Sequence, residues 1–440
     1  MTLVIILLLS IPLSFSQVPN QSQVLSNFIR QFRFKPLGAL QKRPALFQLG
    51  EKLFNDQQLS GKSNISCQSC HSPQAFTADT LPLGVGEGSW GEGQVRRQQG
   101  GALLARHTPA LFNLGFSDVT TLFWDGRVMK HPQGGWLTPE PKLNGPAPEL
   151  THLSATLDSL LAVQALFPIA NPEEMLGAGS KKTTTQAWEE AAERIFKGPF
   201  GNTYLKQFQA AYPGVVNFNI GHIANAIAEF QRHAFHSANT PWDNFLRGNT
   251  TGLSPRMLKG GVLFFTKAAC INCHIGDHFT RFVNFQNIGI PQVGPGVRNG
   301  DDKGRYEVSG RGSDLYKFRV PPLRNVAMTA PYMHSGVFKN LWEVIAHYNN
   351  SQTTFSTFEW DPSNIRYRDL LVLDTNGTNQ DNRERSLSGG FNRALALTAE
   401  EQKDLYCFVV GALTDLQFQS TTVFKGVINE VSDCTLNSRP

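Results

Sequence analysis

The clearest pattern of hydrophobic and polar positions in this chain is the one that predicts amphipathic helices. Between residues 219 and 236 the apolar residues recur at intervals of three and four, which puts them on one helix face. These residues are Ile220, Ile223, Ala224, Ile227 and Phe230. A second helix is predicted from Thr398 to Leu413, where Thr398 and Glu401 form a capping box. The alternation typical of strands is limited to short pieces such as 320–323.

The segments between the helices predict long loops and a division of the chain. Stretches rich in proline, glycine and asparagine lie at 80–101, 287–304 and 374–390. A chain of 440 residues is longer than one hydrophobic core usually serves. We place a boundary in the polar stretch after the 219–236 helix, which gives units of 17–236 and 237–440. The sequence thus predicts a mainly α protein with two domains, long loops and few short strands.

Residues 1–16 form a short apolar segment that ends in small residues before Gln17. This pattern is typical of a secretory signal peptide, and the segment is too short to span a bilayer comfortably. No later segment is long and apolar enough to cross a membrane, so we predict a periplasmic or secreted protein without a membrane span. The formal charge is only +5, and Lys and Arg are dispersed, which argues against nucleic acid as a partner.

The motif Cys-x-x-Cys-His occurs twice, at 67–71 and at 270–274. It is the attachment signature of c-type haem, in which both thiols bond to the porphyrin and the histidine binds the iron. A zinc half-site and a redox-active cysteine pair are the alternatives. Zinc requires four ligands, and a redox pair has no use for the histidine. The sequence therefore predicts two covalently bound c-type haems, held by Cys67, Cys70 and His71 and by Cys270, Cys273 and His274.

Two cysteines, Cys407 and Cys434, are not used by the haem motifs. In an oxidising compartment an even pair can form a disulfide that fixes the C-terminal tail. Two buried free thiols are the alternative, and the sequence leaves both open.

Similar segments precede the two haem motifs, Gly50 to Phe54 and Gly260 to Phe264, which indicates a faint internal repeat.

Further motifs occur in a characteristic order around the two haem sites. They are Leu53-Phe54, Arg106-His107-Thr108-Pro109-Ala110-Leu111-Phe112-Asn113, Phe123-Trp124-Asp125-Gly126-Arg127, Asn171-Pro172-Glu173-Glu174-Met175, Pro322-Leu323-Arg324-Asn325-Val326 and Thr329-Ala330-Pro331-Tyr332-Met333-His334. In this order the chain resembles the di-haem cytochrome c peroxidase and MauG superfamily. The resemblance implies a haem-dependent oxidoreductase with an N-terminal peroxidatic haem domain and a C-terminal electron-transfer haem domain.

The resemblance assigns Gln164 and Glu174 to the distal pocket of the N-terminal haem. They lie ten residues apart, around a predicted turn at Pro168. Cleaving the O–O bond of a peroxide requires a proton to move from the near oxygen to the leaving one, and one positioned carboxylate can do this. From the residues alone, Glu173 and Glu174 would only cap or solvate a helix start. The resemblance selects Glu174 as catalytic and leaves Glu173 at the surface.

The resemblance also assigns residues between the haems. It places Trp124 there as an electron relay, whereas the residues alone would predict a core aromatic before a turn. Asn113 and the backbone carbonyls of Thr329 and Pro331 match a calcium site between the haems. These are hard oxygen donors, which calcium prefers.

The sixth ligand of the second haem separates the branches of the resembled family. The peroxidase branch presents a methionine about one helix after the Thr329–His334 motif. Here no methionine follows Met333, and the segment 341–350 presents Tyr348 at the matching position, as in the MauG branch. A phenolate ligand lowers the iron potential. A core tyrosine, with His347 or no side chain on the iron, is the alternative, but the register from Pro331 favours Tyr348.

The first haem is expected to have an open distal side. Many family peroxidases hold a removable histidine in the loop before the Arg106 motif, and no histidine occurs between His71 and Arg106. His107 lies inside the motif and is interpreted as structural. We therefore expect an iron that is ready for peroxide without reductive activation.

Three functions follow from these features. The favoured one is a MauG-like oxidase that uses hydrogen peroxide to form a high-valent di-haem state and then oxidises a protein substrate, with tryptophan as one target. The second is a cytochrome c peroxidase that reduces hydrogen peroxide with electrons from a small cytochrome or copper protein. The third, a di-haem electron carrier, would leave Gln164 and Glu174 without a role. Ala268 and Ala269, just before the second haem motif, offer no aromatic exit there.

Overall fold

The computed structural model describes residues 20–91, 97–98, 101–146, 152–297, 300–351, 387–388, 394–418 and 434. It is mainly helical, as predicted, and its strands are short. The α-helices between residues 44 and 234 are α2 (Pro44–Phe54), α3 (Cys67–Cys70), α4 (His152–Thr156), α5 (Leu160–Ala170), α6 (Thr184–Lys197), α7 (Gly201–Ala211) and α8 (Ile220–Ala234). The others are α1 (Gln21–Phe32), α9 (Pro241–Leu246), α10 (Pro255–Phe265), α11 (Tyr306–Ser309), α12 (Leu341–Asn349) and α15 (Ala399–Cys407).

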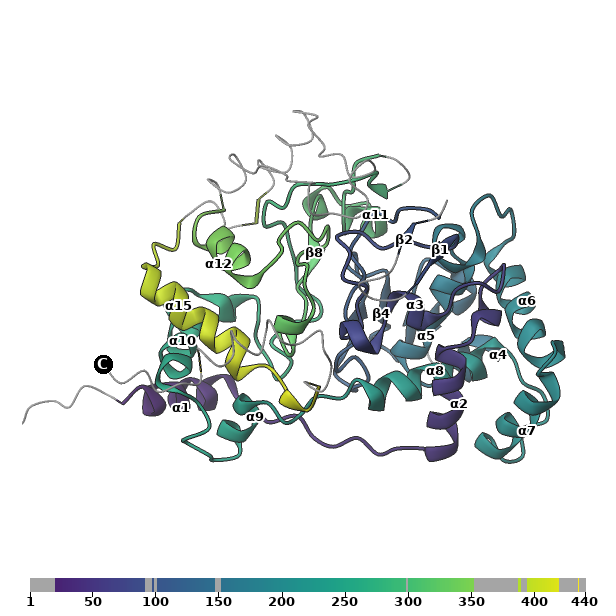
Figure 1. Cartoon of the computed structure of the whole chain (residues 1–440), viewed down its shortest axis with the longest axis horizontal. Helices are drawn as coiled ribbons and strands as arrows, with labels where there is room; N and C mark the ends of the chain where they lie inside the picture. The colour runs from purple at the N-terminus through teal and green to yellow at the C-terminus, as the bar shows by residue number, and fades with distance from the viewer. Residues whose placement is uncertain are drawn as a thin grey trace, which may run out of the picture.

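The buried apolar side chains form two clusters. One is built mainly from α2 and α5–α8, and the other from α1, α9, α10, α12 and α15. Figure 1 shows these two groups of helices on opposite sides of the molecule. Helix α1 belongs to the second cluster although it precedes the first in sequence, because it packs against α10. The domain boundary between residues 236 and 237 stays a prediction. The structure adds that residues 21–32 pack in the second cluster.

The predicted internal repeat has a structural counterpart in two helix crossings. Helix α2 packs against α8, and α10 packs against α15. At the first crossing a Cβ on Gly50 would collide with the Ala226 carbonyl, and at the second a Cβ on Gly260 would collide with the Asp404 carbonyl. The same glycine of the repeated segment therefore lets each pair of helices approach closely.

The two helices predicted from periodicity are present. Helix α8 begins after Asn219, whose side chain accepts hydrogen bonds from the backbone of Gly221 and His222. Helix α15 begins after Thr398, which forms the predicted capping box with Glu401. It ends at Cys407 and continues as a π-helix over Phe408–Ala412. The apolar faces of both helices are buried, as their spacing predicted.

The strands form small antiparallel sheets. They are β1 (Ser89–Trp90), β2 (Arg97–Gln98), β3 (Thr121–Leu122), β4 (Val128–Lys130), β5 (Gly135–Leu137), β6 (Gly145–Pro146), β7 (Phe285–Gln286) and β8 (Phe318–Arg319). β3–β6 form one four-stranded sheet in sequence order, β1 pairs with β2, and β7 pairs with β8. The predicted strand at 320–323 is wrong, since β8 ends at Arg319. Pro321 and Pro322 have no N–H group with which to continue the ladder.

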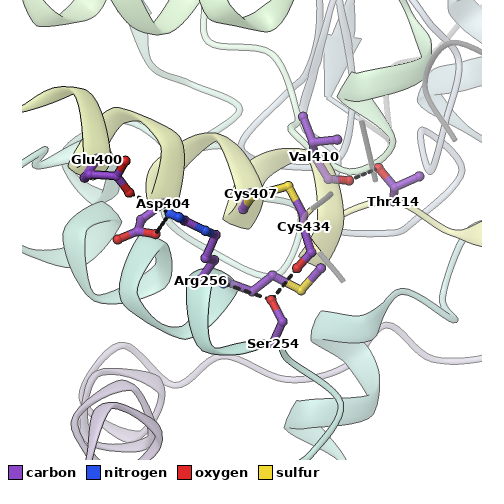
Figure 2. Close-up of a disulfide and its surroundings, with 9 residues drawn as sticks. Ser254, Arg256, Glu400, Asp404, Cys407, Val410, Thr414 and Cys434 are labelled. Carbon is purple, nitrogen blue, oxygen red and sulfur yellow. Dashed lines mark hydrogen bonds and ion pairs between the residues drawn. A yellow bond between two sulfur atoms is a disulfide. The ribbon is translucent and has the colours of Figure 1, made fainter. Parts of the chain in front are cut away.

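The disulfide between Cys407 and Cys434, one of the two predicted alternatives, is formed. It joins the end of α15 to a residue that lies against the start of α10, where the Ser254 hydroxyl donates to the Cys434 carbonyl at 2.5 Å (Figure 2). Arg256 in the same helix bridges Glu400 and Asp404 of α15. The disulfide and the Ser254 hydrogen bond hold Cys434 against the second cluster.

Two predictions lie largely or wholly outside the described residues. These are the signal peptide at 1–16 and most of the loop at 374–390. The predicted loop at 80–101 contains the β1–β2 pair. Within the described ranges, no helix is both long and apolar enough to cross a bilayer.

Candidate active site

The first haem motif lines a cavity of about 850 Å³. Cys67 and Cys70 are the ends of the short helix α3, which Ser66 and Ser69 cap reciprocally. His71 follows directly, and its Nδ1 is 2.9 Å from the Thr77 carbonyl oxygen. A hydrogen bond from Nδ1 to a backbone carbonyl is the usual way in which a metal-binding histidine is oriented. The turn therefore presents two thiols and an oriented imidazole to one cavity.

The second haem motif lines a smaller cavity of about 280 Å³. His274 Nδ1 is 2.8 Å from the Phe279 carbonyl oxygen, which repeats the arrangement at His71. Burial lowers the pKa of His274 to about 4, so the imidazole is neutral, and this is the form that binds metals. Within the described chain, none of the four thiols of the two motifs is in a disulfide. Both cavities fit the predicted covalent haems.

A buried guanidinium in the second cavity adds to this fit. Arg319 is 5% exposed, its Nε donates to the Phe123 carbonyl at 2.9 Å, and its Nη1 has no hydrogen-bond partner among the described residues. Burial lowers its pKa to about 10, so the group is still charged at neutral pH. A buried cation is costly without an anion. Asp125, whose charge raises this pKa, is already paired with Arg106. A haem carries two propionate carboxylates, and one of them would balance Arg319.

Replacing Arg319 by Gln is expected to lower the reduction potential of the second haem in the holoenzyme. Loss of a positive charge beside a propionate favours the more oxidised, more positive iron. A spectroelectrochemical titration that separates the two haems measures the shift. Arg319→Lys keeps the charge and is expected to retain most of the potential. An unchanged potential in Arg319→Gln would contradict the pairing.

Trp124 lies where the two cavities meet, since it lines both of them. Its Nε1 donates to the His107 carbonyl at 2.9 Å, and its own carbonyl accepts from the Arg319 N–H at 2.7 Å. The His107 ring is held by the Leu81 carbonyl at 2.8 Å, and burial lowers its pKa to about 4. The indole is therefore fixed between the two haem positions.

Gln164 and Glu174 both line the first cavity, as predicted from the resemblance. The predicted turn at Pro168 is wrong, because α5 continues through Pro168 to Ala170. Pro168 lies in the last turn of the helix, where its missing N–H costs only the hydrogen bond to the Gln164 carbonyl. The chain turns instead at Asn171, which caps the π-helix Pro172–Leu176 that carries Glu174.

The Glu174 carboxylate has one hydrogen-bond donor and one ion-pair partner. Asn171 Nδ2 donates to Oε1 at 2.8 Å, and Arg127 Nη2 lies 3.8 Å from the same oxygen. The side chain is only 22% exposed, and burial raises its pKa against the opposing effects of Arg127 and Asn171. A raised pKa makes the carboxylate a stronger proton acceptor, which can then return the proton. Glu173, its neighbour, is exposed.

Sequence reasoning missed the backbone clamp around Glu174. The Glu87 N–H donates to the Glu174 carbonyl at 2.7 Å, and the Gly61 N–H donates to the Met175 carbonyl at 2.8 Å. The buried Glu87 carboxylate accepts from Lys62 at 3.0 Å and from Asn64 at 2.8 Å. Two glycines, Gly61 and Gly86, are the sequence signal that could have indicated this close approach of backbones. A Cβ on Gly61 would collide with the Leu176 carbonyl, and a Cβ on Gly86 would collide with the Glu173 carbonyl.

Tyr348, and not His347, lines the second cavity together with Cys270, Cys273 and His274. His347 is fully buried elsewhere, with its Nε2 2.7 Å from the Ile288 carbonyl oxygen. Burial raises the pKa of Tyr348, so the phenol carries its proton at neutral pH and would have to lose it to bind an iron. The placement agrees with the register predicted from Pro331, and ligation of the iron stays a prediction.

The predicted calcium donors are one buried side-chain amide and two backbone carbonyl oxygens. The Asn113 amide is buried and forms two bonds to Ser237, with Oδ1 accepting from N–H at 2.8 Å and Nδ2 donating to the carbonyl at 2.9 Å. Thr329 follows the 3₁₀ turn Val326–Met328, and a cis peptide joins Ala330 to Pro331. The parts of the chain that are described hold no cluster of three or more His, Cys, Asp or Glu side chains suited to a metal. The calcium site stays a prediction.

Haem attachment points in two cavities that share one tryptophan are suited to electron transfer between two haems. They define the class of the protein as a haem-dependent oxidoreductase. The Di-haem cytochrome c peroxidase family model matches residues 44–251. The chain is 29% identical over 341 residues to cytochrome c551 peroxidase of Pseudomonas aeruginosa, covering 77% of this chain and 78% of the relative. It is 28% identical over 337 residues to MauG of Methylorubrum extorquens, covering 75% and 77%.

Solved structures agree with these relatives. A MauG-like protein associated with microbial copper homeostasis has a TM-score of 0.59 and 26% identity, with 89% of this chain and 96% of that chain covered. The di-haem peroxidase BthA of Burkholderia thailandensis shares the fold, with a TM-score of 0.58 at 20% identity over 87% and 88% of the two chains. Along most of its length the chain is similar to members of the di-haem cytochrome c peroxidase and MauG superfamily. It is an enzyme that carries two haems and uses hydrogen peroxide.

Proposed function

We propose that this enzyme is a MauG-like oxidase, which uses hydrogen peroxide to oxidise a residue of a protein substrate, with tryptophan as the favoured target. The observation that carries the proposal is the phenol of Tyr348 in the second haem cavity, where the peroxidase branch presents a methionine. An anionic oxygen ligand lowers the potential of a haem iron and stabilises its higher oxidation states. A haem of low potential is poorly suited to receive electrons from a small redox protein.

The proton chemistry is assigned to the first cavity. When bound, the two haems supply the electrons that reduce peroxide to water and recover them from the substrate. Glu174 takes the proton from the near peroxide oxygen and returns it to the leaving oxygen, and its raised pKa suits the first of these steps. Gln164 lines the same cavity and orients the peroxide. Arg127 and Asn171 hold the carboxylate between the two transfers.

The open side of the first haem and the relay between the haems support the same proposal. No histidine lies between His71 and Arg106, and the segment around Glu87 is bonded to the Glu174 turn. The distal side is thus assembled without a ligand that must first leave. Trp124, fixed by the His107 carbonyl, is assigned the transfer of electrons between the two cavities.

The remaining expectations belong to the same proposal. Residues 17–236, apart from α1, which packs in the second core, form the peroxidatic haem domain. Residues 237–440 form the Tyr-ligated haem domain, and 1–16 direct export to the periplasm or the exterior. Covalent haem and the Cys407–Cys434 disulfide both suit an oxidising compartment. Asn113, Thr329 and Pro331 are the candidate ligands of one calcium ion between the haems, with water completing its shell.

A cytochrome c peroxidase is the second candidate, because curated relatives carry that name at similar identity. The two candidates differ in the electron donor. If Tyr348 keeps the second haem at low potential, turnover of peroxide with reduced cytochrome c is expected to be poor. Stopped-flow oxidation of ferrocytochrome c by the holoenzyme and peroxide measures it, with a known peroxidase of the family as the positive control. Brisk turnover would favour the second candidate.

A further inference from the structure

Two aromatic rings on different helices of the second cluster are stacked at the surface. Trp342 in α12 and Tyr406 in α15 have ring centroids 4.1 Å apart and planes 10° apart. Trp342 is 38% exposed, whereas Tyr406 is 3% exposed. The pair therefore reaches from solvent into the packed interface between the two helices.

The two helices that carry this stack also line the second haem cavity. Leu341, the neighbour of Trp342, and Leu405, the neighbour of Tyr406, both line the cavity. Tyr348, the candidate iron ligand, projects into the same cavity from the helix that carries Trp342. Ala268 and Ala269, directly before the haem cysteines, have no aromatic ring that could carry electrons to the surface. The stacked rings of α12 and α15 offer an aromatic route that the sequence did not indicate.

We propose that Trp342, stacked on Tyr406, is the surface point through which electrons from a protein substrate reach the second haem. The inference rests on the proposed function and adds the docking face and the chemistry of the partner. The partner is a protein that presents an oxidisable aromatic side chain, tryptophan or tyrosine, to the face around Trp342. Indole and phenol are the side chains that can be oxidised by one electron and then reduced again, which an aliphatic contact cannot do.

The electrons balance with peroxide as the oxidant. Each hydrogen peroxide takes two electrons and two protons and leaves as two water molecules. The two electrons come one at a time from the partner's side chain, through Trp342 and Tyr406, and the side chain loses the two protons. Trp342 and Tyr406 return to their starting state after each transfer, so no bond in the relay is made or broken overall.

The experiment exposes the holoenzyme to a small excess of hydrogen peroxide without any reductant and maps oxidised residues by mass spectrometry. Without a partner, oxidising equivalents that leave the second haem through the relay end at its exposed ring, so Trp342 is expected to gain oxygen atoms several-fold faster than Trp90. Trp90 is the matched control, because it is more exposed, at 48%, and lines neither haem cavity. Attack by peroxide from solvent would instead modify Trp90 at least as fast.

Three variants complete the test. Tyr406→Phe keeps a stacked ring that is hard to oxidise and is expected to suppress the oxidation of Trp342. Trp342→Phe is expected to lengthen the lifetime of the peroxide-induced spectrum without changing the rate at which it forms. Trp90→Phe is expected to change neither.

The outcomes separate this inference from the proposed function. Peroxide-induced spectra that form normally but decay equally in all variants, with no preference for Trp342, overturn the relay and leave the proposed function standing. A holoenzyme whose spectrum does not respond to peroxide overturns the proposed function and the relay with it.

Discussion

Glu174→Gln is expected to slow the reaction of the holoenzyme with hydrogen peroxide by about 10²–10⁴-fold, the usual worth of a positioned acid–base group. The amide keeps the size of the side chain but cannot take the first proton from peroxide. Single-turnover stopped-flow spectroscopy with both haems in their resting state measures this step directly. The bound haem content, counted from the absorption spectrum, is expected to be unchanged.

The pH dependence gives an independent readout of the same residue. Burial raises the pKa of Glu174, and only the deprotonated form accepts the proton, so the wild-type rate is expected to rise with pH through that raised pKa. The Gln variant is expected to lack this rise. Glu173→Gln, at the exposed neighbouring position, is the matched control and is expected to keep this rise but at a lower pH, because the Glu173 charge is one of the causes that raise the pKa of Glu174. Wild-type rates in Glu174→Gln would exclude the carboxylate from the proton transfer.

The second large effect is expected from Tyr348→Phe. Both haems are expected to remain attached, because the thioether bonds depend on Cys67, Cys70, Cys270 and Cys273. The peroxide-induced spectral signature is expected to disappear, since phenylalanine offers no oxygen to the second iron. Resting-state absorption and electron paramagnetic resonance of the second haem measure the loss of the ligand in the same sample.

Tyr332→Phe is a suitable control for this variant. Tyr332 also lines the second cavity, and its hydroxyl donates a long bond, 3.4 Å, to the Ala327 carbonyl. The Tyr332→Phe substitution removes a phenol hydroxyl from the same cavity without removing the candidate ligand. A Tyr348→Phe enzyme whose spectra match those of wild type would remove Tyr348 from the ligand set.

Features encoded by local spacing could be predicted from the sequence. The two Cys-x-x-Cys-His turns need only five consecutive residues each, and the 219–236 helix needs only its apolar period. The position of Tyr348 in the second cavity also followed from a register along one short helix. His347, one residue earlier, faces the Ile288 carbonyl, as a helix turn of about 100° per residue requires.

Features that depend on distant segments could not be predicted. The clamp on Glu174 joins residues from before and after the first haem motif, and no local pattern shows that Glu87 meets Glu174. The packing of α1 on α10 depends on a partner more than 200 residues later. The predicted turn at Pro168 is wrong because a proline in the last turn of a helix removes only one hydrogen bond, although proline usually breaks a helix. The predicted strand at 320–323 is wrong for the opposite reason, because its two prolines have no N–H group to donate to a neighbouring strand.

The disulfide at Cys407 and Cys434 has a consequence for the biogenesis of this protein. Of six cysteines, four must stay reduced until haem is ligated, while two must lose electrons to an oxidant. Each attachment pair is separated by only two residues and can itself close into a ring that blocks ligation. A production host must therefore supply a dithiol oxidant and a haem ligation apparatus in the same compartment, together with a reductant that reopens such rings.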